Sequence, residues 1–236
     1  MLAVPYQTMT HDQWTAVDEF IARRLHERDE ALDAALAASA EAGLPAIQVS
    51  PCHGKMLHLL ARAMGARRIL EIGTLGGYST IWLARALPTG GRLISLEANP
   101  KHAEVARANI ARAGLAGAVE VRLGRALDTL PQLAAEQAGP FDLFFIDADK
   151  EHIAEYFDWA IRLGRPGSLI LVDNVVREGA VLDAESADTA VQGVRRFIER
   201  LGRDQRVSAT VVQTVGVKKY DGFALAVITA ATARTP

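Results

Sequence analysis

Residues 67–80, RRILEIGTLGGYST, decide the fold of this chain of 236 residues. The stretch begins as an apolar run typical of a buried strand and then turns at Gly73, Gly76 and Gly77, which allow a close backbone approach to a ligand. It continues into YSTIWLARALP, whose apolar residues recur at helical spacing. A strand, a glycine-rich turn and a helix in this order predict the first unit of an α/β sheet, with a ligand site at the turn.

Downstream of this unit, apolar strand-like runs continue to alternate with helical patterns, which is typical of a parallel sheet. The connection between the last two runs is too short for a parallel crossover, so we expect them to form an antiparallel hairpin. The sequence therefore predicts a Rossmann-like α/β fold with seven strands, six parallel and one reversed. The strand runs after the first are residues 92–98, 119–124, 141–148, 168–174, 207–216 and 223–229.

The first 65 residues contain helical patterns and no strand pattern. Residues 11–43 are predicted as helix, Leu44 and Pro45 break it, and a further helix follows over residues 53–65. We expect these helices to cap one edge of the sheet or to join two copies in a homodimer. Because no repeat or linker is evident, residues 1–236 are predicted as a single domain, with a helical cap over 1–65 and an α/β core over 66–230.

Composition narrows the class of protein. Half of the residues are hydrophobic and 23% are charged, which is typical of a globular domain. The net charge of -2 favours neither nucleic acid nor an anionic membrane as a partner. A single cysteine, Cys52, excludes an internal disulfide and fits a reducing compartment. With no signal-peptide pattern and no apolar stretch of ~20 residues, a cytoplasmic location is expected.

Two acidic residues near the glycine-rich turn indicate the kind of ligand. Glu97 ends the second strand run, where a carboxylate accepts hydrogen bonds from the ribose hydroxyls of an adenosine ligand. Glu71, inside the first run, is costly to bury unless it is paired. It suits a cationic amino-acid or sulfonium group, or else a salt bridge to a neighbouring arginine. Leu75 stands where a dinucleotide fingerprint needs glycine, which argues against the alternative of a dinucleotide-dependent oxidoreductase.

Oxygen-donor side chains follow two neighbouring strand runs. Asp147 ends the fourth run, while Asp173 and Asn174 end the fifth, so all three are expected at the same edge of the sheet. Two carboxylates and an amide favour Mg²⁺, Mn²⁺ or Ca²⁺ over zinc. The alternative is that they only cap neighbouring helices. Four histidines have no metal-ligand spacing and are expected at the surface or behind the site: His53, His58, His102 and His152.

The motifs LEIGTLGGYS, SLEANP, IDADK and LVDNV resemble those of the cation-dependent O-methyltransferases related to caffeoyl-CoA and catechol O-methyltransferases, over roughly residues 45–230. The resemblance implies a class I methyltransferase fold, S-adenosylmethionine as cofactor, and a small hydroxylated acceptor of catechol or phenylpropanoid type. It implies metal ligands at Asp147, Asp173 and Asn174, and Lys150 as the catalytic base. Cofactor contacts are implied at Val49, Glu71, Gly73, Thr74, Gly77, Ser79, Glu97, Ala126 and Asp149.

The implied chemistry is metal-assisted. A metal-bound hydroxyl loses its proton more readily and is held in position, so the cation acts as Lewis acid and template together. Lys150 acts as a base only if burial or the cation lowers its pKa, and is otherwise a surface lysine. Two alternatives stay open, a metal-independent methyltransferase and a catalytically silent module that binds the cofactor for regulation.

The sequence departs from the family pattern around the acceptor. Val176 and Arg177 stand where bacterial relatives often have an aromatic residue, and Ile153 replaces a frequent tyrosine. The hairpin VGVKKYDGFAL is expected to have a connection longer than a tight turn. Arg177, Lys218 and Lys219 would also suit an acidic or acylated acceptor.

Overall fold

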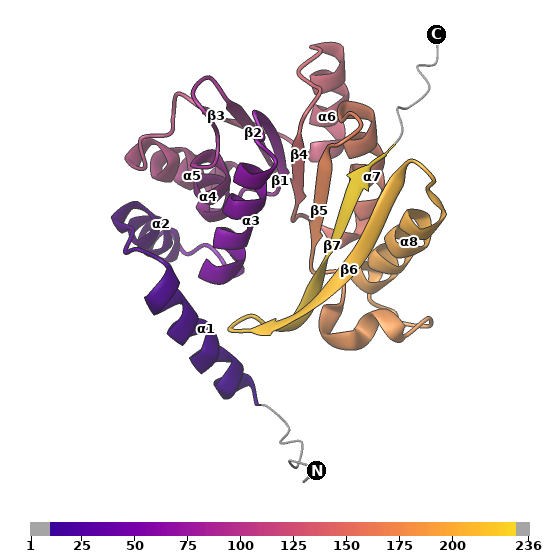
Figure 1. Ribbon diagram of the computed structural model, residues 1–236, viewed down its shortest axis with the longest axis horizontal. Coiled ribbons are helices and arrows are strands. Elements are labelled where there is room, and N and C mark those ends of the chain that lie inside the picture. Colours follow the sequence, from indigo (N-terminus) through magenta and orange to yellow (C-terminus); the bar gives the residue numbers. More distant parts are fainter. Residues whose placement is uncertain (1–9, 230–236) are drawn as a thin grey trace.

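A seven-stranded sheet forms the centre of the computed structural model, which describes residues 10–229 (Figure 1). The strand order is β3-β2-β1-β4-β5-β7-β6, and β7 alone runs against the others. This confirms the predicted fold. The strands are β1 (Arg68–Ile72), β2 (Arg92–Glu97), β3 (Val119–Leu123), β4 (Leu143–Ile146), β5 (Leu169–Asp173), β6 (Val207–Gly216) and β7 (Lys219–Ile228).

Helices cover both faces of the sheet, so the fold has three layers (Figure 1). On one face, α2 to α5 pack onto Ile69, Leu143 and Phe145 of the central strands. On the other face, α6 to α8 pack onto Leu70 and Phe144. The strands are therefore buried on both sides, which explains their nearly continuous apolar sequence. These helices are α2 (Glu30–Glu41), α3 (Pro51–Ala63), α4 (Tyr78–Ala84), α5 (Pro100–Arg112), α6 (Ala126–Ala135), α7 (Ile153–Leu163) and α8 (Thr189–Arg203).

The chain order reverses between β1 and β4, because β2 and β3 lie on one side of β1 while β4 and β5 lie on the other. Connections leaving β1 and β4 therefore diverge, and they leave a crevice at the carboxyl ends of these two strands. The loops that follow β1, β4 and β5 all open at this edge of the sheet.

The N-terminal helical segment is divided, which corrects the prediction of helix throughout residues 11–43. Helix α1 (His11–Leu25) ends before α2, and Asp29 caps α2 by accepting from the backbone N–H groups of Ala31 and Leu32. Asp29 also pairs with Arg85, at the C-terminus of α4. Asp29 therefore caps the start of α2 and also fixes that start against α4. The chain changes direction between α1 and α2 instead of continuing as one helix.

The hairpin connection is also shorter than predicted. Gly216 pairs with Lys219, so the turn contains only two residues, and Lys219 adopts a φ of 69°. The residues assigned to a long connection instead extend β7. As a result the tip reaches α1, where the Val217 N–H donates to Asp18 Oδ2 at 2.9 Å (Figure 1). Lys218 Nζ donates to the Ala46 carbonyl at 2.9 Å, so the hairpin also contacts the loop before α3.

No helix within residues 10–229 has both the length and the apolar character needed to cross a bilayer. Residues 1–9, on which part of the expectation about targeting depends, lie outside the described residues.

At the opposite edge from the crevice, Asp142 holds the starts of three strands together. Its Oδ2 accepts from the N–H groups of Arg67 and Arg68 at 2.8 and 2.9 Å, and its Oδ1 accepts from Arg165 at 2.6 Å. Burial alone would raise the pKa of Asp142, but these donors outweigh burial and hold it below its ordinary value. The ionised carboxylate therefore stabilises the fold above the unfolded-state pKa of about 4, and this contribution is lost as the pH falls through the folded-state pKa.

We predict that Asp142→Asn lowers the free energy of unfolding by about 1–3 kcal/mol at pH 7, because the backbone donors lose a charged acceptor. The difference from the unmodified chain should shrink as the pH is lowered below about 4. Urea unfolding at several pH values measures both effects. Glu104→Gln, an exposed change of the same charge, is the control; a stability loss for Asp142→Asn that did not vary with pH would contradict the assignment.

Candidate active site

The glycine-rich loop after β1 packs directly against the end of β4. Gly73 has a φ of 99°, and a Cβ atom at this position would lie 2.0 Å from the carbonyl oxygen of Asp147. Any other residue would therefore force the two loops apart. The Asp147 N–H in turn donates to the Ile72 carbonyl at 2.8 Å. These contacts place the loop and Asp147 at one point of the crevice.

Glu97 shapes the same loop from the other side. Its Oε2 accepts from the N–H groups of Thr74 and Leu75 at 3.2 and 2.8 Å, while its Oε1 accepts from Asn99 N–H at 2.9 Å. The side chain is 8% exposed, and His102 Nδ1 lies 3.6 Å from its Oε1. Since each carboxylate oxygen can accept more than one hydrogen bond, Glu97 keeps acceptor capacity beyond these three donors.

Glu71 is fully buried, and its partners are three hydroxyl groups rather than an arginine. Ser79 and Ser95 donate to it at 2.6 Å each, and Thr80 donates as well. Burial raises the pKa of Glu71 to about 7, although the three hydroxyl donors act in the opposite direction. Because Ser79 and Thr80 lie in the first turn of α4, this network ties α4 to the central strands.

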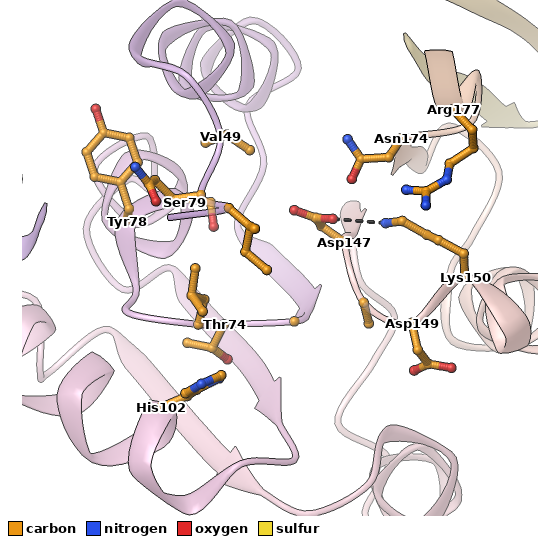
Figure 2. Close-up of a pocket in the computed structure, with 15 residues that line it drawn as sticks. Val49, Thr74, Tyr78, Ser79, His102, Asp147, Asp149, Lys150, Asn174 and Arg177 are labelled. Carbon is orange, nitrogen blue, oxygen red and sulfur yellow. Dashed lines mark hydrogen bonds and ion pairs between the residues drawn. The ribbon is translucent and has the colours of Figure 1, made fainter. Parts of the chain in front are cut away.

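A cavity of about 460 Å³ opens beside the loop (Figure 2). Most of the predicted site residues line it together, from the loops after β1, β4 and β5 and the segment before α3. Figure 2 shows Asp147, Lys150, Asn174 and Arg177 gathered on one side and Thr74 and His102 on the other. The predicted residues in the lining are Val49, Gly73, Thr74, Ser79, Asp147, Asp149, Lys150 and Asn174.

Four predicted cofactor contacts lie outside this lining. Glu71 is behind Ser79, and Glu97 is behind the backbone of the glycine-rich loop. Gly77 is the N-cap residue of α4 with a φ of 82°, and it packs against Ala106. Ala126 begins α6 and belongs to the hydrophobic core. In this structure these residues support the cavity wall, and their direct contact with a cofactor stays a prediction.

Acidic and amide side chains gather between β4 and β5. Lys150 is 8% exposed, and its Nζ donates to Asp147 Oδ1 at 2.9 Å (Figure 2). Burial, and then the neighbouring charge of Asp147, raise the pKa of Asp173 well above its ordinary value. Asn174 adopts a φ of 57°, and its N–H donates to Asp173 Oδ1. We call Asp147, Asp173 and Asn174 the oxygen cluster.

The oxygen cluster fits a hard divalent cation by its chemistry. Two carboxylates and an amide oxygen are ligands that Mg²⁺, Mn²⁺ and Ca²⁺ accept. The negative charge of Asp147 opposes the ionisation of Asp173, and a bound cation would remove this repulsion. Among residues 10–229 there is no group of three or more carboxylate, histidine and cysteine side chains able to hold an ion, so the amide of Asn174 would have to complete the set.

Asp149 lines the cavity, but both of its oxygens have partners. Tyr156 donates to Oδ1 at 2.5 Å, and His152 contacts Oδ2. Burial opposes ionisation here, yet these two partners outweigh it and hold the pKa of Asp149 below its ordinary value. Asp149 is thus a charged residue at neutral pH, and its side chain is oriented by α7.

A second cavity of about 460 Å³ lies on the other side of the oxygen cluster. It shares Val49, Asn174 and Arg177 with the first cavity, so the two adjoin. Apolar side chains and cationic side chains both contribute to its lining. These are Met56 and Phe223 on the apolar side, and Arg177, Lys218 and Lys219 on the cationic side.

His53 was expected either at the surface or behind the site, and the structure places it beside Asp173 of the oxygen cluster. Its Nδ1 lies 3.8 Å from Asp173 Oδ2, and its ring packs against Phe145 and Phe223 with centroid distances of 6.2 and 5.5 Å. Burial lowers the pKa of His53, although the charge of Asp147 acts in the opposite direction. His53 lies in the first turn of α3 and lines the second cavity, which follows from the packing of α3 against the sheet.

His102 and Tyr78 also line the first cavity without having been predicted there. His102 lies in the first turn of α5, shortly after the capping residue Asn99. That helix start was readable from the sequence, so the proximity of His102 to Glu97 could have been inferred. Ile153, which was expected to depart from the family pattern, is 1% exposed and belongs to the core.

The fold and the site together define an enzyme of the open α/β class with a ligand cavity at its topological switch point. The O-methyltransferase family model matches residues 24–227. The chain is 58% identical to a catechol O-methyltransferase of Niastella koreensis over 220 residues, which cover 93% of this chain and all of the relative.

Two solved structures agree closely with this one. An O-methyltransferase from Bacillus cereus in complex with SAH has a TM-score of 0.92 and 55% identity, covering 93% of this chain and 100% of that one. The O-methyltransferase TomG from Streptomyces achromogenes, involved in tomaymycin synthesis and solved with SAM, has a TM-score of 0.91 and 52% identity, covering 94% and 100%. The chain therefore belongs to the O-methyltransferase family, which confirms the family and enzyme class expected from its motifs.

We predict that Glu71→Gln reduces the pH dependence of stability in the cofactor-free enzyme. In the unmodified chain the unfolded state ionises Glu71 near pH 4.5 while the folded state retains the proton to about pH 7. Stability attributable to this group therefore falls as the pH rises between these values, on the order of 3 kcal/mol in total. Glutamine does not titrate, so the variant should lack this decline.

Unfolding in urea between pH 4.5 and pH 8 measures the difference between the two chains, with Glu104→Gln as the exposed control. Parallel stability curves for the unmodified chain and Glu71→Gln would show that Glu71 ionises normally in the folded state.

Proposed function

We propose that this enzyme transfers the methyl group of S-adenosylmethionine to a hydroxyl oxygen of a small aromatic acceptor, with the help of a divalent cation. One observation carries the proposal: two adjoining cavities meet at the oxygen cluster. In this arrangement the first cavity holds the cofactor and the second holds the acceptor. The SAH and SAM complexes of the two similar O-methyltransferases support the choice of cofactor.

The cofactor would be held by the loop after β1 and by the segments on either side. Gly73 and Thr74 offer backbone close to the ligand, and Ser79 is held in place by Glu71. Glu97 would accept the ribose hydroxyls through its remaining acceptor capacity. The charge of Asp149 suits the cationic end of the cofactor.

The cation would be held by Asp147, Asp173 and Asn174. Bound there, Mg²⁺, Mn²⁺ or Ca²⁺ would act as a Lewis acid on the acceptor hydroxyl. The residues of the chain supply the positioning. His53 supports Asp173 from behind, and Lys150 keeps Asp147 in a defined orientation. Apolar residues of the second cavity would exclude water from the acceptor ring.

The reaction is a direct displacement. A bond forms between the acceptor oxygen and the methyl carbon while the bond between that carbon and the sulfonium sulfur breaks, which releases the neutral thioether. The hydroxyl proton must leave, and Lys150 in its neutral form would accept it at Nζ. Lys150 lines the first cavity, and its hydrogen bond to Asp147 keeps it beside the oxygen cluster.

We predict that Asp173→Ala and Glu97→Ala separate the two halves of the site. Asp173→Ala should lose metal-stimulated methyl transfer to catechol but bind S-adenosylmethionine within about twofold of the unmodified enzyme. Glu97→Ala should weaken cofactor binding at least about tenfold, which corresponds to roughly 1.4 kcal/mol. Calorimetry measures cofactor affinity, and a labelled-methyl assay with and without EDTA measures turnover.

EDTA should abolish turnover of the unmodified enzyme, and added Mg²⁺ should restore it. Full activity in EDTA would support the metal-independent alternative instead. Lys150→Met in the same assay tests the base: if its rate at neutral pH equals that of the unmodified enzyme, the proton leaves by another route. Glu104→Gln is the control for all three variants, since its side chain is exposed on α5.

A homodimer is the assembly that the surface favours. Apolar side chains are exposed on α1 and on β6 at the adjoining hairpin, among them Phe20 at 53% and Val215 at 53%. Helix α1 contributes no buried residue within one copy, so apolar side chains such as Phe20 remain exposed on it. Burying these side chains between two copies would recover the free energy of apolar surface.

We predict a mass of twice 25.4 kDa by light scattering. Phe20→Asp should shift the protein toward the single-chain mass, because a charge would then enter the interface. Glu19→Gln, on the same helix, is the control. A single-chain mass for the unmodified protein at micromolar concentration would overturn the dimer.

A further inference from the structure

We propose that the natural acceptor carries a carboxylate on its aromatic ring or on a short ring substituent, and that Arg177 binds this carboxylate in the second cavity. The inference rests on the proposed function, because it identifies the class of acceptor for that site. It concerns a residue that lines both cavities and has no assigned part in methyl transfer.

The backbone of Arg177 is held in a strained but well-supported position. Its φ is 56°, in the left-handed region that favours glycine. This backbone conformation is unfavourable for arginine, so other contacts must stabilise it. The N–H groups of Val176 and Arg177 both donate to Asp221 Oδ1 at 3.0 Å. Asp221 lies on β7, so the hairpin fixes the loop that follows the oxygen cluster.

This conformation directs the guanidinium toward the cavities. Figure 2 shows the side chain of Arg177 beside Lys150, on the same side of the cavity as Asn174. Its Nε is buried and has no hydrogen-bond partner within the described chain. An arginine remains charged at any relevant pH, and a buried donor without an acceptor is unfavourable. A ligand carboxylate would supply the missing acceptor through paired hydrogen bonds.

The carboxylates of the second cavity are engaged elsewhere. Asp18 Oδ2 accepts from Val217 N–H, Asp221 Oδ1 accepts from backbone donors, and Asp173 belongs to the oxygen cluster. Lys219 approaches Glu178 at 3.8 Å. Lys218 has one bond to a neutral carbonyl, so its charge, like that of Arg177, remains available to an anion.

The rest of the lining indicates what joins the carboxylate to the reacting hydroxyl. Met56 and Phe223 give the cavity an apolar wall suited to a planar ring. The oxygen cluster lies at one boundary and Arg177 is three residues beyond Asn174. A ring that bears both a hydroxyl and a carboxylate could present the hydroxyl to the oxygen cluster and the carboxylate to Arg177. At about 460 Å³, the cavity suits a single-ring acid.

Matched acids and amides test the proposal. Protocatechuate and dihydrocaffeate place a carboxylate at two distances from the same dihydroxyphenyl ring, and the primary amide of each keeps the shape without the charge. For the unmodified enzyme with Mg²⁺, we expect kcat/KM for at least one acid to exceed that of its amide at least about tenfold. Calorimetry in the presence of S-adenosylhomocysteine should give the same order of affinities without turnover.

Arg177→Gln should remove most of this acid preference, measured as the acid-to-amide ratio of kcat/KM and as the ratio of Kd values. Arg177→Lys keeps the charge without the planar fork and should retain part of it. Arg203→Gln removes the same charge from an exposed position on α8 and should leave both ratios unchanged. Comparing ratios keeps the result independent of any general loss of activity or stability.

The outcomes separate this inference from the function on which it rests. Acids and amides methylated equally well, or an acid preference that persists in Arg177→Gln, would overturn the carboxylate assignment while leaving methyl transfer intact. A strong preference for caffeoyl-CoA over both acids would also overturn it in favour of a phosphate-bearing acceptor. No methyl transfer to any of these probes or to catechol would count against the proposed function itself.

Discussion

The contact between Gly73 and the backbone of Asp147 is the constraint on which the site depends. A side chain at Gly73 would overlap the Asp147 carbonyl, so only glycine lets the loops after β1 and β4 meet. Since β1 and β4 are neighbours in the sheet, this contact lies at the point where the strand order reverses. It places the glycine-rich loop, which forms a wall of the first cavity, next to Asp147 of the oxygen cluster. The chemistry proposed for this enzyme requires that proximity, because a methyl group moves only between atoms in contact.

Four acidic residues around this contact are stabilised in four different ways. Glu71 accepts from hydroxyl groups, Glu97 from backbone N–H groups, and Asp147 pairs with Lys150. Asp173 accepts from one backbone donor and lies near His53, but burial and the charge of Asp147 oppose its ionisation. Glu71 and Glu97 therefore support the loop and helix around the first cavity, whereas the repulsion between Asp147 and Asp173 is what a cation would relieve. Burial and partners, rather than residue type, set the different environments of these four acids.

Much of this could be predicted from the sequence because the signals are local. Alternating apolar runs and helical patterns predicted all seven strands, and a connection too short for a crossover predicted the hairpin. Parallel strands present their carboxyl ends at one edge, so the sequence predicts that Asp147 and Asn174 lie together, and both line the first cavity. The break before α2 was missed, because the pairing of Asp29 with Arg85 joins residues far apart in the chain. The two-residue hairpin turn was missed because Lys219 takes a conformation that its residue type does not favour.

By itself, then, the sequence determined the α/β architecture, the edge of the sheet that carries the site and the family of the enzyme. These follow from periodicity, from glycines at a turn and from the residues that end each strand. Only the tertiary structure decided that Glu71 supports Ser79 instead of lining the cavity, that His53 stands behind Asp173, and that Arg177 points into the space shared by both cavities. The physical reason is that burial and partnership depend on packing between distant segments. The type of each residue is known from the sequence. The charges and dipoles that surround it depend on how α3, the strand ends and the hairpin pack together.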